Sequence, residues 1–137
     1  MAETLKLEIV TPEAKIYSEE VEMVTLPGSE GELGIYPNHV PLMTQVHAGE
    51  IIVSRGGTEE VLAVGEGFIE GTGNHVAILT DNAANSADID EAAAEEARSK
   101  AENRLKEGDI SEEEARILNQ AILYSEAQIK AKRRKRG

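Results

Sequence analysis

The chain has 137 residues, a formal net charge of −12, 3% aromatic residues and no cysteine. This length suits one domain of ordinary size with an appendage, and the missing cysteines exclude disulfides and thiolate metal sites. Scarce aromatic rings disfavour nucleic-acid binding, and no apolar run approaches the ~18 residues that span a bilayer. We therefore expect membrane association only through partner proteins or through the basic C-terminal tail.

Residues 1–84 carry the alternating pattern of short β-strands. Leu5, Leu7 and Ile9 alternate with polar residues, and the segment 21–26 is of the same β-rich kind. Further strands are expected over 42–46, 50–54, 59–64, 68–70 and 75–80, with glycine-containing turns between several of them. Short strands at this spacing predict an N-terminal β-sandwich of about ten strands with an aliphatic core.

Glycine and proline are concentrated between residues 27 and 49. Glycine permits positive φ and proline fixes φ, so this run predicts turns that hold Glu30, Glu32 and His39 on an ordered surface. Three of the glycines recur at every third position, but neither a helix start nor a Gly-Lys-Ser/Thr sequence follows them. Phosphate binding by this loop is therefore not expected.

The composition changes near Asp81, where alanine and glutamate replace glycine and the apolar period becomes helical. Asp88 followed by Glu91 resembles a capping box, which predicts a first helix from residue 89 to about residue 106. Gly108 then supplies a stop signal. The boundary near Asp81 separates the sandwich from a C-terminal helical part.

A second capping box, Ser111 with Glu114, predicts a second helix through roughly Lys132. The fold class is therefore α+β in two parts, with the sandwich over 1–84 followed by an antiparallel two-helix hairpin over 87–134. The apolar stripe of the first helix consists mostly of alanine, so the hairpin should hold only weakly to the sandwich. Such an element suits a conformational switch, and a plain helical appendage is the alternative.

The last eight residues form a basic tail, because they hold six of the 14 basic residues and no acidic one. Anionic lipid, nucleic acid and an acidic protein surface are all possible partners for such a tail, and composition does not choose among them. A tail over 130–137 without any partner is a further alternative. No serine has a convincing base and no histidine has metal-ligand spacing, so we expect neither catalysis by this chain nor a metal site.

Three segments resemble the epsilon subunit of bacterial F-type ATP synthase. The first reads GSEGELGIYPNH from Gly28 to His39, followed by Pro41, Leu42 and Thr44; the others are GEGFIE at 65–70 and VAILTDNA at 76–83. The similarity extends along nearly the whole chain. It implies a non-catalytic rotor subunit, peripheral to the cell inner membrane on its cytoplasmic side, which couples c-ring rotation to ATP synthesis and inhibits ATP hydrolysis.

The resemblance also implies partners and site residues. The partners are the gamma subunit and the c-ring, and in an extended state also the beta and alpha subunits; the membrane is reached only through the complex. The implied interface with gamma and the c-ring contains Glu30, Glu32, Tyr36 and His39. The implied inhibitory tail contains Lys132, Arg133, Arg134, Lys135 and Arg136, which would lie beside an acidic segment of beta.

Some epsilon subunits bind ATP through an Ile-Asp-x-x-Arg-Ala motif, and this chain has a degenerate form of it. Ile89 and Asp90 match, but Ala93 replaces the arginine, and Gln120 and Tyr124 stand where the second helix has arginines. Arginine forks bind phosphate in a way that these side chains cannot reproduce, so we expect no bound cofactor. A free-standing anion-binding module that uses the basic tail remains the alternative function.

Overall fold

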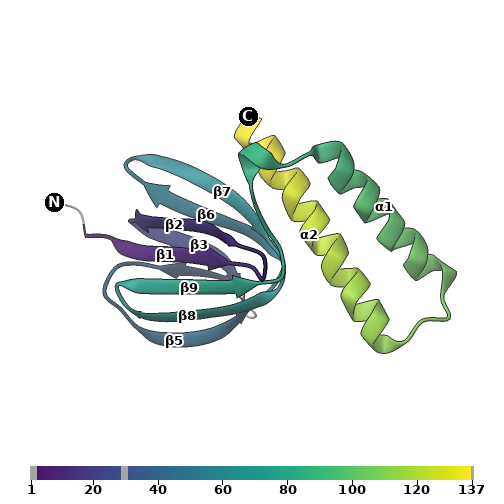
Figure 1. Ribbon diagram of the computed structural model, residues 1–137, viewed down its shortest axis with the longest axis horizontal. Coiled ribbons are helices and arrows are strands. Elements are labelled where there is room, and N and C mark those ends of the chain that lie inside the picture. The colour runs from purple at the N-terminus through teal and green to yellow at the C-terminus, as the bar shows by residue number, and fades with distance from the viewer. Residues whose placement is uncertain (1–2, 29–30, 137) are drawn as a thin grey trace.

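The computed structural model describes residues 3–28 and 31–136 and contains ten strands, one short 3-10 helix and two α-helices (Figure 1). The strands are β1 (Leu5–Val10), β2 (Lys15–Val21), β3 (Met23–Gly28), β4 (Gly31–Ile35), β5 (His39–Val46), β6 (Gly49–Arg55), β7 (Thr58–Val64), β8 (Gly67–Gly73), β9 (His75–Thr80) and β10 (Ala83–Asn85). The helices are η1 (Ser86–Asp88), α1 (Glu91–Glu107) and α2 (Glu112–Arg136). The predicted β-sandwich with a C-terminal helical hairpin is confirmed.

The strands are hydrogen-bonded in the order β10-β7-β6-β3-β5-β8-β9-β1-β2, and β4 pairs with β3 outside this path. The β1–β9 pair is parallel, whereas the other pairs are antiparallel. This path curls so that its strands form facing layers around one core (Figure 1). The parallel pair joins the first strand of the chain to the last long strand of the sandwich.

The core of the sandwich is aliphatic, as the composition predicted. Alternate residues of β1 are buried, which places Leu5, Leu7 and Ile9 inside. The cluster also contains Tyr17, Val21, Val24, Leu26, Ile35, Val46, Ile51, Val53, Leu62, Val64, Ile69, Val76 and Ile78. Every one of these residues lies before the helices, so the sandwich has a core of its own.

Three strands were not anticipated from the sequence, and one of them, β4, lies where the glycine-rich run predicted turns. Residues 31–35 form β4, in which Leu33 pairs with Leu26 and Ile35 pairs with Val24. Pairing with β3 and burial of Ile35 outweigh the low strand propensity of the glycines. The other two are β2, which exposes most of its polar side chains, and β10, which has only three residues.

The N-terminal cap of α1 differs from the predicted one. Asp90, and not Asp88, caps the helix, because its Oδ1 accepts a hydrogen bond from the Ala93 amide at 3.1 Å. Asp88 instead belongs to η1. Ile89, which follows η1 in the chain and precedes α1, is extended and buried. Burial of Ile89 against the sandwich therefore delays the start of α1 by two residues.

The cap of α2 agrees with the prediction, but the helix is longer than expected. The Glu114 amide donates to Ser111 Oγ at 3.0 Å, which is the first half of the predicted capping box. The helix then continues to Arg136 instead of ending near Lys132. The basic tail is consequently the last part of α2 and not a separate segment.

Candidate functional site

The hairpin is docked on the sandwich through α2, which lies against β6 and β7 while α1 packs on its outer side (Figure 1). A small second cluster joins the two parts: Val61 and Ala63 of β7 pack with Ile89, Ala127 and Ala131. Three of its five buried members are alanines. Because apolar burial stabilises in proportion to area, this contact contributes little. It is made mainly by α2, and not by the alanine stripe of the first helix from which weak docking was expected.

Ion pairs join α2 to the sandwich near both ends of the helix. Arg116 Nη1 lies 2.6 Å from Glu66 Oε1, and Arg134 Nη2 lies 3.0 Å from Glu50 Oε1. The arginines are 18 residues apart, or about 27 Å along the helix axis. Glu50 raises the pKa of Arg134, and Glu113 and then Glu66 raise the pKa of Arg116, because each carboxylate favours the charged guanidinium.

Lys132, Arg133 and Arg134, the described cations of the predicted inhibitory tail, each contact a different element. Lys132 Nζ donates to the Ala87 carbonyl oxygen at 3.4 Å, and Arg133 Nη2 lies 3.2 Å from carboxylate oxygens of both Glu91 and Glu95 on α1. Arg134 contacts β6 through Glu50, as described above. The side chains of Lys135 and Arg136 lie outside the described residues. In this docked arrangement these three cations are bound by other residues of the same chain.

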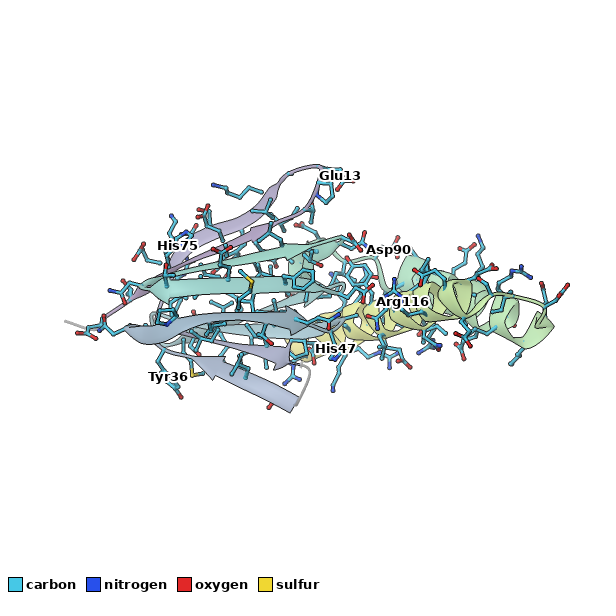
Figure 2. All side chains as sticks on the ribbon, turned by 90° about the horizontal axis from the view of Figure 1, so that it is seen from below. Glu13, Tyr36, His47, His75, Asp90 and Arg116 are labelled. Atoms are coloured by element: carbon cyan, nitrogen blue, oxygen red, sulfur yellow. The ribbon has the colours of Figure 1, made fainter. Side chains whose placement is uncertain are left out.

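The structure separates Glu32 and Tyr36, the two predicted interface residues whose side chains it describes. Glu32 is exposed on β4 and acts electrostatically on Arg134, near the hairpin. Tyr36 is 62% exposed and lies at the end of the sandwich away from the helices (Figure 2). Four residues of extended chain separate the two, roughly 13 Å. Glu30 and the side chain of His39 lie outside the described residues.

The turn before β5 is held by asparagine side chains. Asn38 has a φ of 64°, a left-handed conformation that asparagine tolerates better than most residues. Its amide donates to Asn74 Oδ1 at 2.7 Å, and its Nδ2 donates to Glu3 Oε2 at 2.6 Å. These bonds fix the point where β5 begins, and therefore the backbone position of the predicted interface residue His39.

An exposed apolar face, which we define as Val10, Met43, Phe68 and Leu79, was missed by the sequence reasoning. Met43, Phe68 and Leu79 are 73%, 61% and 51% exposed on β5, β8 and β9. Phe68 pairs directly with Leu79, which pairs with Val10, and a cavity of about 520 Å³ lies beside them. Strand alternation could have found this face, since Ile69 and Ile78 point into the core and their neighbours must point out. Exposed apolar patches of this kind mark protein interfaces.

The degenerate ATP motif serves the local structure of the hairpin start. Ile89 belongs to the small cluster, Asp90 caps α1, and Ala93 is exposed. Gln120 and Tyr124 line a second cleft of about 520 Å³ between α2 and the sandwich. Gln120 Oε1 is buried there without a hydrogen-bond partner in the described part of the chain.

Neither a metal site nor a membrane-spanning helix is present among the described residues. Within residues 3–28 and 31–136, no group of three or more histidine, aspartate or glutamate side chains is placed to hold a metal ion. Among the same residues, no helix is long and apolar enough to cross a membrane.

The chain matches the family model described as "ATP synthase, Delta/Epsilon chain, beta-sandwich domain" over residues 4–86. The ATP synthase epsilon chain of Desulforamulus reducens is 43% identical over 105 residues, which are 77% of this chain and 80% of that protein. The epsilon chain of Dehalococcoides mccartyi is 47% identical over 98 residues, or 72% and 70% of the two chains. Both matches are longer than the match to the sandwich-domain model.

Solved structures show the same fold. A chain of the Euglena gracilis mitochondrial ATP synthase has a TM-score of 0.74 at 24% identity and covers 93% of this chain and 81% of its own. A chain of the Tetrahymena thermophila enzyme has a TM-score of 0.61 at 11% identity, with coverages of 95% and 97%. The family match and the relatives together confirm the predicted resemblance: the chain belongs to the epsilon chains of bacterial F-type ATP synthase, which are non-catalytic subunits of the central stalk.

Proposed function

We propose that this subunit couples rotation of the c-ring to ATP synthesis and inhibits ATP hydrolysis through its C-terminal helices. The observation that carries the proposal is the two-part build: a sandwich with its own core and a hairpin docked through a small alanine-based contact. A weakly docked element can change position at a cost of a few kcal/mol. Removing the hairpin and measuring ATP hydrolysis by the reassembled complex tests the proposal.

The sandwich is proposed to contact the gamma subunit and the c-ring. Its apolar face offers the surface that a protein partner would cover, and β5 connects this face to His39 at the start of the same strand. Glu32, on β4, and Glu30, which precedes that strand in the sequence, are proposed to face the polar part of the c-ring. The subunit would thereby be peripheral to the inner membrane on its cytoplasmic side, attached only through the complex.

We expect a cysteine at position 39 to cross-link to a cysteine placed in gamma, because His39 begins the strand that carries Met43 on the apolar face. The yield of the cross-link on a denaturing gel, after mild oxidation of the assembled complex, measures this. Met43→Cys should cross-link as well, whereas Glu13→Cys, in the β1–β2 connection, should not. Free reaction of both cysteines with a water-soluble maleimide in the complex would contradict the assignment.

The basic end of α2 is proposed to be the inhibitory element. Lys132, Arg133, Arg134, Lys135 and Arg136 would meet an acidic surface of the beta and alpha subunits when the hairpin extends. Arg133 and Arg134 are held by carboxylates in the docked hairpin. An acidic surface on a partner could replace those carboxylates one for one, because both kinds of contact are charge-assisted hydrogen bonds.

We expect the isolated subunit to bind Mg-ATP weakly or not at all, because Ala93, Gln120 and Tyr124 offer no cation to the phosphates. The arginines that could substitute already have carboxylate partners: Arg104 is paired with Glu107 and Glu114, and Arg116 is paired with Glu66 and Glu113. Calorimetric titration with Mg-ATP should give only the heat of dilution. Micromolar affinity would show that these arginines change partners to build a site.

A further inference from the structure

The Glu50 carboxylate on β6 lies beneath the end of α2, and its side chain is only 10% exposed. Arg134 grips it with two hydrogen bonds, from Nε to Oε2 at 3.1 Å and from Nη2 to Oε1 at 3.0 Å. Lys130, one helical turn earlier, places its Nζ 3.9 Å from Oε1. Glu32 and Glu59 add negative potential around Arg134. One carboxylate thus receives two cations from successive turns of the helix.

This ion pair has more weight than an ordinary surface pair because it is partly desolvated. Charges that lose water interact more strongly than exposed ones, while the apolar contact beside them is limited to a few alanine, valine and isoleucine side chains. When α2 leaves the sandwich, both Glu50 and Arg134 regain water. The contact between them exists only in the docked arrangement, so its net free energy bears on docking and not on the fold of either part.

The second ion pair, between Arg116 and Glu66, contributes less to the free-energy difference between the docked and released states. Arg116 also pairs with Glu113 on its own helix at 3.1 Å, so it keeps a carboxylate after release. Arg134 gives both of its described hydrogen bonds to Glu50 across the boundary between the two parts. Release of the hairpin breaks both contacts, but Arg116 keeps Glu113 whereas Arg134 loses both of its described hydrogen-bond acceptors.

We propose that Glu50 and Arg134, supported by Lys130, form an ion-pair latch that sets the fraction of subunits whose hairpin is docked. One of the cations assigned above to inhibition, Arg134, is in this state bound to the subunit's own sandwich. Inhibition would then require the latch to open first. The consequence for the complex rests on the proposed function, but the latch itself is a property of the isolated chain.

Distance measurement between two spin labels in the isolated full-length subunit tests the latch. The chain contains no cysteine, so Thr72→Cys on β8 and Asn103→Cys on α1 give two unique labels at exposed positions of the two parts. Pulsed dipolar spectra then report docked and released populations. Arg98→Gln is the matched control, because it removes one positive charge whose partner, Glu102, lies on the same helix.

We expect Arg134→Gln to lower the ratio of docked to released subunits roughly tenfold, because it leaves Glu50 buried without its main cation. Arg134→Gln with Lys130→Gln should lower it further. Glu50→Gln should have a smaller effect, about threefold, because nearly half of the Arg134 side chain remains in water. The reversed pair Glu50→Arg with Arg134→Glu should restore part of the docking that each single variant loses, because Lys130, Glu32 and Glu59 keep their charges around the exchanged groups. Raising salt from 0.1 to 1 M, which shortens the Debye length from about 10 to about 3 Å, should release the natural chain.

Two results would overturn the latch. One is a docked population in Arg134→Gln that equals that of Arg98→Gln at both salt concentrations. The other is release by each single variant without recovery in the reversed pair, which would mean that packing and not charge holds the helix. Circular dichroism melts confirm that each variant is folded. If the latch behaves as expected but hairpin removal does not change hydrolysis, the proposed inhibition fails while the latch stands.

Discussion

Removal of residues 87–137 is expected to raise ATP hydrolysis by the assembled complex about fivefold, the size of a typical coupling between two states of a regulated protein. The sandwich should survive this truncation, because the buried members of its core lie between Leu5 and Ile78 and β10 ends at Asn85. The family model for the sandwich domain also ends at residue 86. What is lost is the hairpin and the small apolar contact with Val61 and Ala63.

Three measurements separate the possible outcomes of this truncation. A cooperative thermal melt of residues 1–86 shows that the sandwich is folded, and co-purification with gamma shows that it assembles. Hydrolysis is then compared between complexes with the natural chain, the truncated chain and full-length Arg98→Gln as the control. Equal hydrolysis rates with the truncated and natural chains would refute inhibition by the hairpin. An unfolded fragment would instead refute the independence of the two parts.

Substitution of Gly67 by alanine is expected to lower the free energy of unfolding by about 3 kcal/mol or more, the upper range for overpacking a tight site. Gly67 begins β8 and pairs with both Val46 and Thr80. An added Cβ would overlap the carbonyl oxygen of Leu79 and lie 2.8 Å from the Cα of Thr80. These are backbone atoms of a neighbouring strand, so they cannot move aside as a flexible side chain would.

Hydrogen bonds beside the contact between Gly67 and β9 increase the loss of stability expected from the Gly67 substitution. The Thr80 hydroxyl is buried and donates to the Gly65 carbonyl oxygen at 2.8 Å, just before Gly67 in the chain. Urea denaturation followed by circular dichroism measures the change. Gly34→Ala is the matched control, because its added Cβ would meet only the Tyr36 ring at 3.9 Å and should change stability by less than about 1 kcal/mol. Equal midpoints for the two variants would show that the β8–β9 pair can spread at no cost.

The elements found from the sequence are those whose local pattern and tertiary role coincide. Alternation in β1 places Leu5, Leu7 and Ile9 in the core, as the sequence predicted. The caps at Asp90 and Ser111 follow from side-chain chemistry within three residues, although burial of Ile89 moved the first cap from the predicted position. In β4 the local and tertiary preferences conflict: two glycines predict turns, and pairing with β3 imposes a strand.

The sequence by itself determined the family, the sandwich and the hairpin, because motifs, strand alternation and helix capping are written in residues close together in the chain. Only the tertiary structure decided that Glu32 and Tyr36 lie apart, that Phe68 and Leu79 share an exposed face, and that Arg134 of the tail is bound to the sandwich. Glu50 and Arg134 are 84 residues apart. Such contacts depend on how the strands pair and where α2 packs, which no local pattern specifies.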